Sequence, residues 1–320
     1  MKKVLIVGSG YMAFEYAKVL DFLKIEFEIV GNRPEKIAIL KESFPNSKCI
    51  EGGYEKYLQY NVPPQYVIIA TPVEISFETT KAFILKGVKN ILTEKPAGLC
   101  HHEINELNEI SKEHEASISV AYNRRFYESI QFAKKIIIED GGISSLHFEF
   151  TEWTHTIDQN KFPPAVLKKF LIANSSHVID TVFHLIGYPK IINPIVSGNN
   201  IGWHPSGSIF CGSGVSIYNI PFTYHSNWGS PGRWSIEIIT PLHRLYLKPM
   251  EKLSIQNIGS VSIEELNESY NLDLSFKPGL YMQIISFLNN QNKDILCSIE
   301  EHSLHFPYYE MMAGYNLNTQ

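Results

Sequence analysis

The N-terminal part of the chain alternates between two hydrophobic periods. Short continuous apolar runs, typical of strands buried on both faces, alternate with segments in which apolar residues recur at helical spacing. The apolar runs are KVLIV (3–7), FEIV (27–30), YVIIA (66–70), KNILT (89–93) and SISVAY (117–122). The helical segments are 14–23, 34–44, 71–87 and 101–114. This alternation predicts an α/β domain with a doubly wound parallel sheet over residues 1–122.

The pattern changes after residue 122. A helical segment covers 124–142, and alternation of period two then predicts a strand over 146–153. Several β-rich runs and two closing helices follow. The runs are 214–220, 233–240, 243–249 and 252–258, and the helices are 280–291 and 298–315, the second kinked or split by Pro307. Residues 123–320 are therefore predicted to form an α+β domain with an open, largely antiparallel sheet.

A glycine loop lies between the first strand and the first helix. It reads Gly8-x-Gly10-x-x-Ala13, with Tyr11 and Met12 completing it. In this context the motif predicts a Rossmann dinucleotide-binding site. Gly8 permits the tight turn, Gly10 lets the backbone approach a pyrophosphate at the helix N-terminus, and Ala13 allows close helix–strand packing. The alternative is a plain tight turn.

The end of the second strand bears on the choice of cofactor. An NAD-preferring site wants an acid there to hold the ribose 2′-hydroxyl, but the chain has Asn32 and Arg33. Glu28 lies within the strand and is expected to face away. A guanidinium suits a 2′-phosphate, so we expect NADP rather than NAD. Alternatively, Arg33 is a solvated turn residue.

Three further strand ends carry polar residues, and strands of a parallel sheet deliver such ends to one edge. The segments are Ala70-Thr71-Pro72, Glu94-Lys95-Pro96, and Tyr122-Asn123-Arg124-Arg125. We expect them to border one crevice. Glu94 would anchor a turn that projects Lys95 into it. Taken alone, the charged pair before a proline also fits a surface turn.

One helical segment of the second half, 174–187, carries a polar stripe. His177, Asp180 and His184 are spaced to lie on one face of a helix capped by Asn174 or Ser175 and ended by Gly187. A carboxylate one turn before an imidazole can orient it and raise its basicity, as in acid–base sites. The alternative is a satisfied core histidine or an interface stripe.

Charge and cysteine content narrow the range of functions. The formal net charge is −5 over 320 residues, without a basic run, which argues against nucleic acid or an anionic membrane as partner. The four cysteines form no CxxC, so neither a metal site nor a disulfide framework is suggested, and a reduced cytoplasm fits. The apolar run after the N-terminal lysines is too short for a signal peptide, and no stretch approaches the length of a membrane span.

Taken together, the motifs resemble the Gfo/Idh/MocA family of NAD(P)-dependent oxidoreductases. The resemblance rests on GSGYMA, IIATP, TEKPAG, YNRRF and the D-x-x-x-H of HVIDTVFH, in this order. It implies that Lys95 lies beside the nicotinamide and the reacting hydroxyl, next to a cis Lys–Pro bond. His184 would be the acid–base with Asp180 beside it, and His177 could share or replace it. The implied cofactor-binding residues are Gly8, Gly10, Tyr11, Met12, Ala13, Asn32, Arg33, Ala70, Thr71, Pro72, Glu94, Lys95 and Asn123, and the implied substrate-binding residues are Lys95, Tyr122, Arg124, Arg125, Asp180 and His184.

The function implied by the resemblance is hydride transfer between a nicotinamide cofactor and a hydroxyl or keto carbon of a sugar. SNWGSPGRWSIE and KPME point to a nucleotide-activated sugar of surface-polysaccharide biosynthesis. A homodimer or homotetramer through the C-terminal sheet is also implied. Two alternatives remain: an NAD-retaining glycosidase or lyase that oxidises its substrate transiently, and a catalytically silent sugar-binding protein. The sugar, the carbon and the direction of the reaction stay open.

Overall fold

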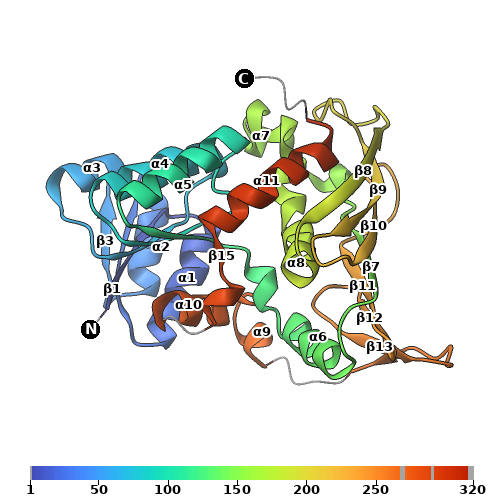
Figure 1. Cartoon of the computed structure of the whole chain (residues 1–320). Coiled ribbons are helices and arrows are strands. Elements are labelled where there is room, and N and C mark those ends of the chain that lie inside the picture. The colour runs from blue at the N-terminus through green and yellow to red at the C-terminus, as the bar shows by residue number, and fades with distance from the viewer. Residues whose placement is uncertain (1, 267–270, 290–291, 316–320) are drawn as a thin grey trace. The chain divides into compact units, whose positions relative to one another are not determined.

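The computed structural model describes residues 2–266, 271–289 and 292–315, and they form two compact units (Figure 1). One unit combines the described residues up to Asn123 with Leu272–Ser303. The other contains the described residues of 124–271 and those from Leu304 onward. The sequence-based boundary lies at 122/123, whereas the first division between the two units falls at 123/124, and residues 272–303 return to the N-terminal unit.

The N-terminal unit is built on a seven-stranded sheet that is parallel except at one edge. The order across the sheet is β15 (Cys297–Ser298), β6 (Ser117–Val120), β5 (Asn90–Thr93), β4 (Tyr66–Ile69), β1 (Lys3–Val7), β2 (Glu26–Gly31) and β3 (Lys48–Glu51). Residues of β1, β4 and β5 are almost wholly buried, as the continuous apolar runs predicted. The predicted doubly wound sheet is confirmed, whereas β3 was not foreseen.

Helices cover both faces of this sheet in Figure 1, with α4 beside α5 on one face and α10 on α1 on the other. The helices of the unit are α1 (Tyr11–Phe22), α2 (Pro34–Ser43), α3 (Gly53–Tyr60), α4 (Val73–Leu85), α5 (His101–Glu113), α9 (Asn271–Ser275), α10 (Leu280–Asn289) and the 3₁₀ turn η5 (Lys293–Ile295).

The return of 272–303 has a physical reason. Phe22 of α1 packs edge-on against Phe276 and Tyr281, with ring centroids 5.2 and 6.1 Å apart, and β15 adds an antiparallel edge strand to β6. These contacts bury apolar surface that residues 2–123 alone leave without a cover.

The second unit is built on an eight-stranded sheet that is antiparallel except where β10 pairs with β7. The order is β14 (Glu264–Glu265), β13 (Ser254–Asn257), β12 (His243–Leu247), β11 (Ser235–Ile239), β7 (Ser145–Glu149), β10 (Pro221–Asn227), β9 (Ile209–Ser216) and β8 (Pro189–Ser197). The predicted open, largely antiparallel sheet is confirmed. The run 214–220 is not a separate strand, because it contains the end of β9 and the turn before β10.

Helical segments accompany this sheet. They are η1 (Asn123–Phe126), α6 (Glu128–Glu139), η2 (Thr154–Thr156), η3 (Gln159–Lys161), α7 (Pro164–Lys168), η4 (Leu171–Ser175), α8 (Ser176–Ile186) and α11 (Ile299–Ala313). The predicted helix 124–142 is thus divided into η1 and α6. The last predicted helix is neither divided nor shortened at Pro307, which lies inside α11. Its first residues belong to the N-terminal unit and the rest to the second.

Helix α8 forms the centre of the second unit. Nine of its eleven residues are buried, and η4 precedes it with π-helical turns. Phe183 stacks on Tyr309 of α11, with centroids 5.7 Å apart. Since polar residues of this helix are buried with the apolar ones, each needs a partner.

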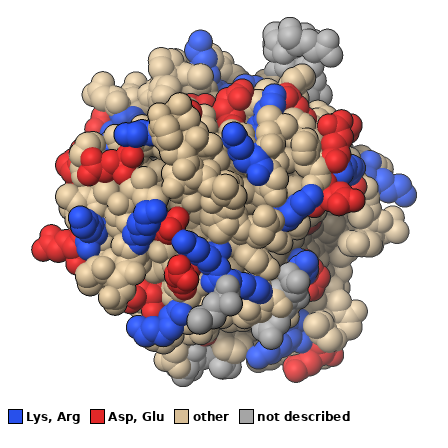
Figure 2. Space-filling model, turned by 90° about the vertical axis from the view of Figure 1, so that its left-hand side faces the viewer, with Lys and Arg blue, Asp and Glu red and all other residues tan. Residues whose placement is uncertain are grey.

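Basic and acidic side chains are intermingled on the face shown in Figure 2, so no single sign of charge dominates it. No helix in the described part of the chain is long and apolar enough to cross a membrane. Within the same residues, no group of three or more histidine, cysteine, aspartate or glutamate side chains could hold a metal ion.

Candidate functional site

The glycine loop has the geometry of a phosphate cradle. Gly8 has φ +131°, and its N–H donates to the Val30 carbonyl at 2.8 Å. A Cβ at Gly8 would lie 2.3 Å from the Ala70 carbonyl oxygen, so glycine is required twice over, by the backbone angle and by the contact. Gly10 is the N-cap of α1, whose first turn contains no acid.

The space beside Gly10 is bordered by the guanidinium of Arg33. A Cβ at Gly10 would meet only Arg33 Nη2, at 4.0 Å. Arg33 is the N-cap residue of α2, directly after β2 and Asn32. The Arg33 side chain therefore lies beside the glycine loop, and its contact with a 2′-phosphate stays a prediction. The choice between NADP and NAD stays a prediction.

Two further observations fit a bound dinucleotide. Thr71 Oγ1, at the end of β4, is buried and has no hydrogen-bond partner among the described residues. Glu28 is held elsewhere, because it accepts from Lys3 Nζ at 2.8 Å and from the Tyr57 hydroxyl at 3.3 Å. The glycine loop can therefore accommodate a pyrophosphate, and the Thr71 hydroxyl is available to hydrogen-bond with a bound dinucleotide.

The turn that carries Lys95 is fixed from several sides. It follows β5, and the Lys95–Pro96 bond is cis, as the resemblance implied. Glu94 Oε1 accepts from the Tyr16 hydroxyl of α1 at 2.6 Å. Burial raises the pKa of the Glu94 carboxyl, while the Tyr16 hydrogen bond and the Lys95 charge lower it. His302 Nε2 lies 2.9 Å from the Pro96 carbonyl oxygen, so the ring donates to it.

Tyr16 and His302 were not identified from the sequence. Tyr16 lies 78 residues before Glu94 and His302 lies 206 residues after Pro96, and neither is part of a motif. Both side chains are fully buried. Tyr16 holds the side chain of Glu94 and His302 holds the carbonyl of Pro96, on either side of Lys95, which is partly buried.

The other predicted residues of this unit lie at the same sheet edge. Because β4, β5 and β6 are adjacent and parallel, Thr71, Lys95 and Tyr122 follow neighbouring strands. Asn123 donates to the Pro278 carbonyl at 2.8 Å and is buried. Tyr11 is 66% exposed, with Lys277 Nζ 5.1 Å from its ring centroid.

Asp180 does not orient His184. Its two carboxylate oxygens accept from Arg125 Nε at 2.7 Å and Nη2 at 2.6 Å, and both side chains are fully buried. This bidentate ion pair joins η1 to α8. The predicted cap is also wrong, since Asn174 and Ser175 donate instead to Glu152 Oε1, at 3.0 and 2.5 Å. Gly187 ends the helix as predicted, with φ +79°.

His184 is less basic than an ordinary histidine. Its Nδ1 lies 3.5 Å from Arg125 Nη1 and its Nε2 lies 3.3 Å from Lys134 Nζ. Burial first, and then the charges of Arg125, Lys134 and His305, lower its pKa from 6.5 to about 2. The expectation that Asp180 raises the basicity of His184 is therefore wrong. The ring is neutral at ordinary pH, so only one of its two nitrogens can accept a hydrogen bond, from either Arg125 or Lys134.

His177 has different surroundings. It is 8% exposed, and its ring centroid lies 6.1 Å from that of Trp234. The guanidinium carbon of Arg124 lies 4.4 Å from the centroid of the same indole. The structure therefore separates the predicted stripe into a structural pair, Asp180 and His184 around Arg125, and a histidine next to an aromatic and cationic group.

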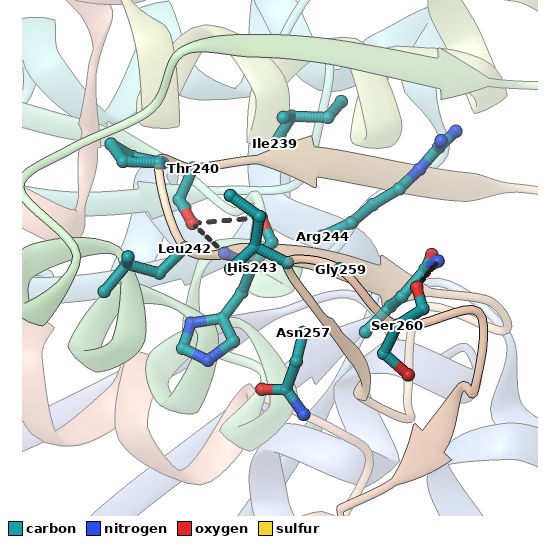
Figure 3. Close-up of a pocket in the computed structure, with 11 residues that line it drawn as sticks. Ile239, Thr240, Leu242, His243, Arg244, Asn257, Gly259 and Ser260 are labelled. Carbon is teal, nitrogen blue, oxygen red and sulfur yellow. Dashed lines mark hydrogen bonds between the residues drawn. The ribbon is translucent and has the colours of Figure 1, made fainter.

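A hollow of about 310 Å³ lies at the β11–β12 and β12–β13 turns (Figure 3). Thr240 bonds to the backbone of His243, and both side chains contact the Asp140 carboxylate, at 2.6 and 2.7 Å. Figure 3 shows the side chains of His243 and Arg244 pointing apart. The lining contains none of the site residues predicted from the sequence. Thr240 and His243 bind the buried Asp140 carboxylate, and these contacts stabilise the turn between β11 and β12.

The fold and the loop define an NAD-binding Rossmann domain in the N-terminal unit. Residues 2–122 match the model of the Gfo/Idh/MocA oxidoreductase family, described as an oxidoreductase family with an NAD-binding Rossmann fold. Over these residues the chain is similar to that family, in agreement with the resemblance noted in the sequence.

Curated relatives match over part of their length. The chain is 28% identical over 201 residues to scyllo-inositol 2-dehydrogenase (NADP(+)) IolW of Bacillus subtilis (strain 168), covering 59% of this chain and 53% of that protein. It is 26% identical over 208 residues to 2,7-anhydro-N-acetylneuraminate hydratase of Escherichia coli (strain K12), covering 61% and 52%. The chain thus spans about half the length of the curated relatives it matches.

A solved structure matches along nearly the whole chain. UDP-N-acetylglucosamine 3-dehydrogenase GnnA from Acidithiobacillus ferrooxidans superimposes with a TM-score of 0.73 at 15% identity, covering 98% of this chain and 97% of that one. At this identity the match shows that the two chains share a fold.

Proposed function

We propose that this protein is an NAD(P)-dependent oxidoreductase that transfers a hydride between a nicotinamide cofactor and a hydroxyl or keto carbon of a sugar or related polyol. The observation that carries the proposal is the pairing of a glycine cradle with a rigidly held lysine at the carboxyl edge of one sheet. The family match of residues 2–122 supports it, and so does the dehydrogenase activity named for the Bacillus relative.

The chain's own residues have distinct roles in this proposal. When bound, the cofactor supplies the hydride acceptor or donor. Gly8, Gly10 and Arg33 hold its phosphates, with Arg33 favouring NADP. Lys95 stabilises the negative charge that develops on the substrate oxygen, as a fixed cation does for an alkoxide.

We assign the proton transfer to His177 rather than to His184. A general base must accept a proton near the working pH, and His184, with a pKa of about 2, is far too weak. Its ring is also occupied by Arg125 and Lys134 on its two nitrogens. His177 lies on the same helix, is 8% exposed, and its ring packs beside that of Trp234.

The test is a turnover assay with purified protein. Polyols, neutral sugars and nucleotide-activated sugars are offered with NADP⁺ or NAD⁺, and reduced nicotinamide is followed by its absorbance. The matched variants are His177→Gln and His184→Gln, each measured from pH 5 to 9. We expect His177→Gln to remove the acid limb of kcat/KM and His184→Gln to retain it. Loss of that limb in His184→Gln alone would overturn the assignment.

A second candidate is an enzyme that retains its cofactor and oxidises the substrate only transiently. The hydratase activity named for the Escherichia coli relative favours it. It predicts reduced cofactor that forms and disappears within one turnover, while product accumulates without added NAD(P)⁺. Rapid-mixing absorbance separates it from a dehydrogenase. Within either candidate, the nucleotide-activated sugar of a surface polysaccharide remains our proposed substrate.

A further inference from the structure

Cationic and aromatic side chains alternate in a row beside His177. The guanidinium carbon of Arg233 lies 4.8 Å from the ring centroid of Trp153 and 4.6 Å from that of Trp234. The guanidinium carbon of Arg124 lies 4.4 Å from the Trp234 centroid and 5.7 Å from that of Tyr127. We call Trp153, Arg233, Trp234 and Arg124 the Arg/Trp row. All four belong to the second unit.

Arg124 has unused hydrogen-bonding capacity. Its Nε is buried without a hydrogen-bond partner among the described residues, and no acid in that part of the chain forms an ion pair with it. Contact with a ring uses the face of a guanidinium and leaves the N–H groups at its edge available. Burial lowers the pKa of Arg124, the neighbouring Tyr127, Glu251 and Glu152 act in the opposite direction, and the charge of Arg233 is the smallest contribution. An arginine stays protonated nonetheless, so a partly buried cation lies here that forms no direct ion pair among the described residues.

Glu152, which lies next to the Arg/Trp row, forms an ion pair with Arg233. Glu152 Oε2 lies 3.4 Å from Arg233 Nη1, while its Oε1 accepts from Asn174 and Ser175. Glu152 therefore forms a direct ion pair with Arg233, whereas Arg124 feels the charges of Glu251 and Glu152 from farther away. Glu152 is 3% exposed by its side chain, so it holds Arg233 in place through a network tied to the start of α8.

The row is also accessible. Trp153 is 49% exposed, unusual for so large an apolar side chain, and its indole N–H donates to the Gly232 carbonyl at 2.7 Å. Arg233 is 42% exposed by its side chain. Trp234, although 7% exposed, keeps a buried indole N–H without a hydrogen-bond partner in the described residues. Unmatched donors and a guanidinium without a direct ion pair suit an oxyanion group.

We propose that the Arg/Trp row is a subsite for an anionic group of the substrate, a phosphate or a carboxylate, which Arg124 and Arg233 bind through their N–H groups. The inference rests on the proposed function and specifies its substrate class as an anionic sugar. The neighbouring His177 ring places this subsite beside the proposed acid–base residue. The stacked rings keep both guanidinium groups in position before the ligand arrives, which lowers the entropy cost of binding.

Binding is tested without cofactor or turnover. Inorganic pyrophosphate and glucuronate are titrated separately into the full-length protein, and tryptophan fluorescence is followed. Two of the chain's four tryptophans belong to the row. We expect saturable binding of at least one anion, weakened about tenfold or more in Arg124→Gln and Arg233→Gln, since each loses a charge-assisted hydrogen bond. Arg124→Lys keeps the charge and should bind with intermediate affinity. Glucuronate without pyrophosphate binding would identify a carboxylate subsite, and the reverse a phosphate subsite.

Two matched controls remove a guanidinium elsewhere. Arg33→Gln removes the cation at the glycine loop, and Arg244→Gln removes one that is paired with Glu237 on the same sheet. Neither should alter binding at the row. Equal affinity in wild type and in both Arg124→Gln and Arg233→Gln, or no saturable binding of either anion, would overturn the proposal. If Arg124→Gln does not fold by circular dichroism, the more exposed Arg233→Gln decides.

Turnover separates the subsite from the proposed function. A sugar 1-phosphate or glucuronate should have a higher kcat/KM than the neutral sugar, and Arg124→Gln should reduce this preference about tenfold or more through KM. Equal efficiency on charged and neutral sugars would refute the subsite and leave the oxidoreductase standing. Anion binding without oxidation of any sugar would refute the oxidoreductase and leave the subsite.

Discussion

His184→Gln should change how stability depends on pH. In the folded protein the pKa of His184 is lowered from 6.5 to about 2, by burial first and then by Arg125 and Lys134. Unfolding releases the ring into water, where it binds a proton below pH 6.5. The unfolded state therefore holds one more proton than the folded state between pH 6.5 and 2. Stability contributed by the neutral ring is fully present above pH 6.5 and is lost as the pH falls below it.

The magnitude follows from this difference in proton binding. Each pH unit below 6.5 costs about 1.4 kcal/mol, so lowering the pH from 7.5 to 5 should cost the wild type about 2 kcal/mol through this one residue. Glutamine does not titrate, and its amide oxygen can still accept from Arg125 or Lys134. His184→Gln should therefore lose about 2 kcal/mol less than the wild type over the same change of pH.

Urea unfolding followed by tryptophan fluorescence is a suitable assay. All four tryptophans, Trp153, Trp203, Trp228 and Trp234, lie in the second unit, as does His184, so the signal reports the unit that the substitution affects. The midpoint and slope are measured at pH 7.5 and 5 for both proteins. His225→Gln makes the same substitution at an exposed position of β10 and serves as the matched control.

One result would refute the reasoning. If wild type and His184→Gln lost the same free energy of unfolding between pH 7.5 and 5, the ring would not be held neutral by its surroundings. Such a result would also reopen His184 as the proton-transfer residue, because its exclusion depends on the lowered pKa.

Three other predictions concern the remaining site residues. Lys95→Ala should lower kcat roughly 10²-fold or more while the dinucleotide still binds, and near wild-type turnover would contradict its role. Arg33→Ala should erase a preference for NADPH over NADH of about tenfold in kcat/KM, about 1.4 kcal/mol, and an unchanged ratio would show that Arg33 does not read the phosphate. Asp180→Asn should destabilise the second unit by about 3–5 kcal/mol, because it leaves the buried Arg125 charge uncompensated, whereas a purely catalytic loss at full stability would count against the structural reading.

Much of the N-terminal fold could be predicted because its signals are local. Buried parallel strands appear in the sequence as continuous apolar runs. The glycine motif can be recognised because Gly8, Gly10 and Ala13 lie within six consecutive residues. The strand β3 was not predicted because it has only four residues, KCIE, with a charged residue at each end and no residue that is fully buried. The same locality explains why Lys95 was correctly predicted to follow a strand, whereas Tyr16 and His302 were missed.

The polar stripe shows where local reasoning failed. Helical spacing relates Asp180 to His184, but the stronger partner of Asp180 is Arg125, 55 residues earlier in the chain. A guanidinium binds a carboxylate through two charge-assisted hydrogen bonds, whereas a neutral imidazole can donate only one hydrogen bond, which is weaker. Which of the two residues binds Asp180 depends on a tertiary contact, and the helical spacing of the sequence cannot predict such a contact.

The return of residues 272–303 to the N-terminal unit has a consequence for synthesis. A nascent chain that has emerged only as far as Asn123 lacks β15 on the edge of its sheet and the rings of Phe276 and Tyr281 against α1. It also lacks His302, which holds the Pro96 carbonyl beside Lys95. Domains generally begin to fold while the ribosome is still translating, but this unit can be completed only after residues 272–303 have emerged. A fragment that ends at Asn123 should therefore aggregate or need a chaperone, whereas co-expression with a segment covering 272–315 should rescue it.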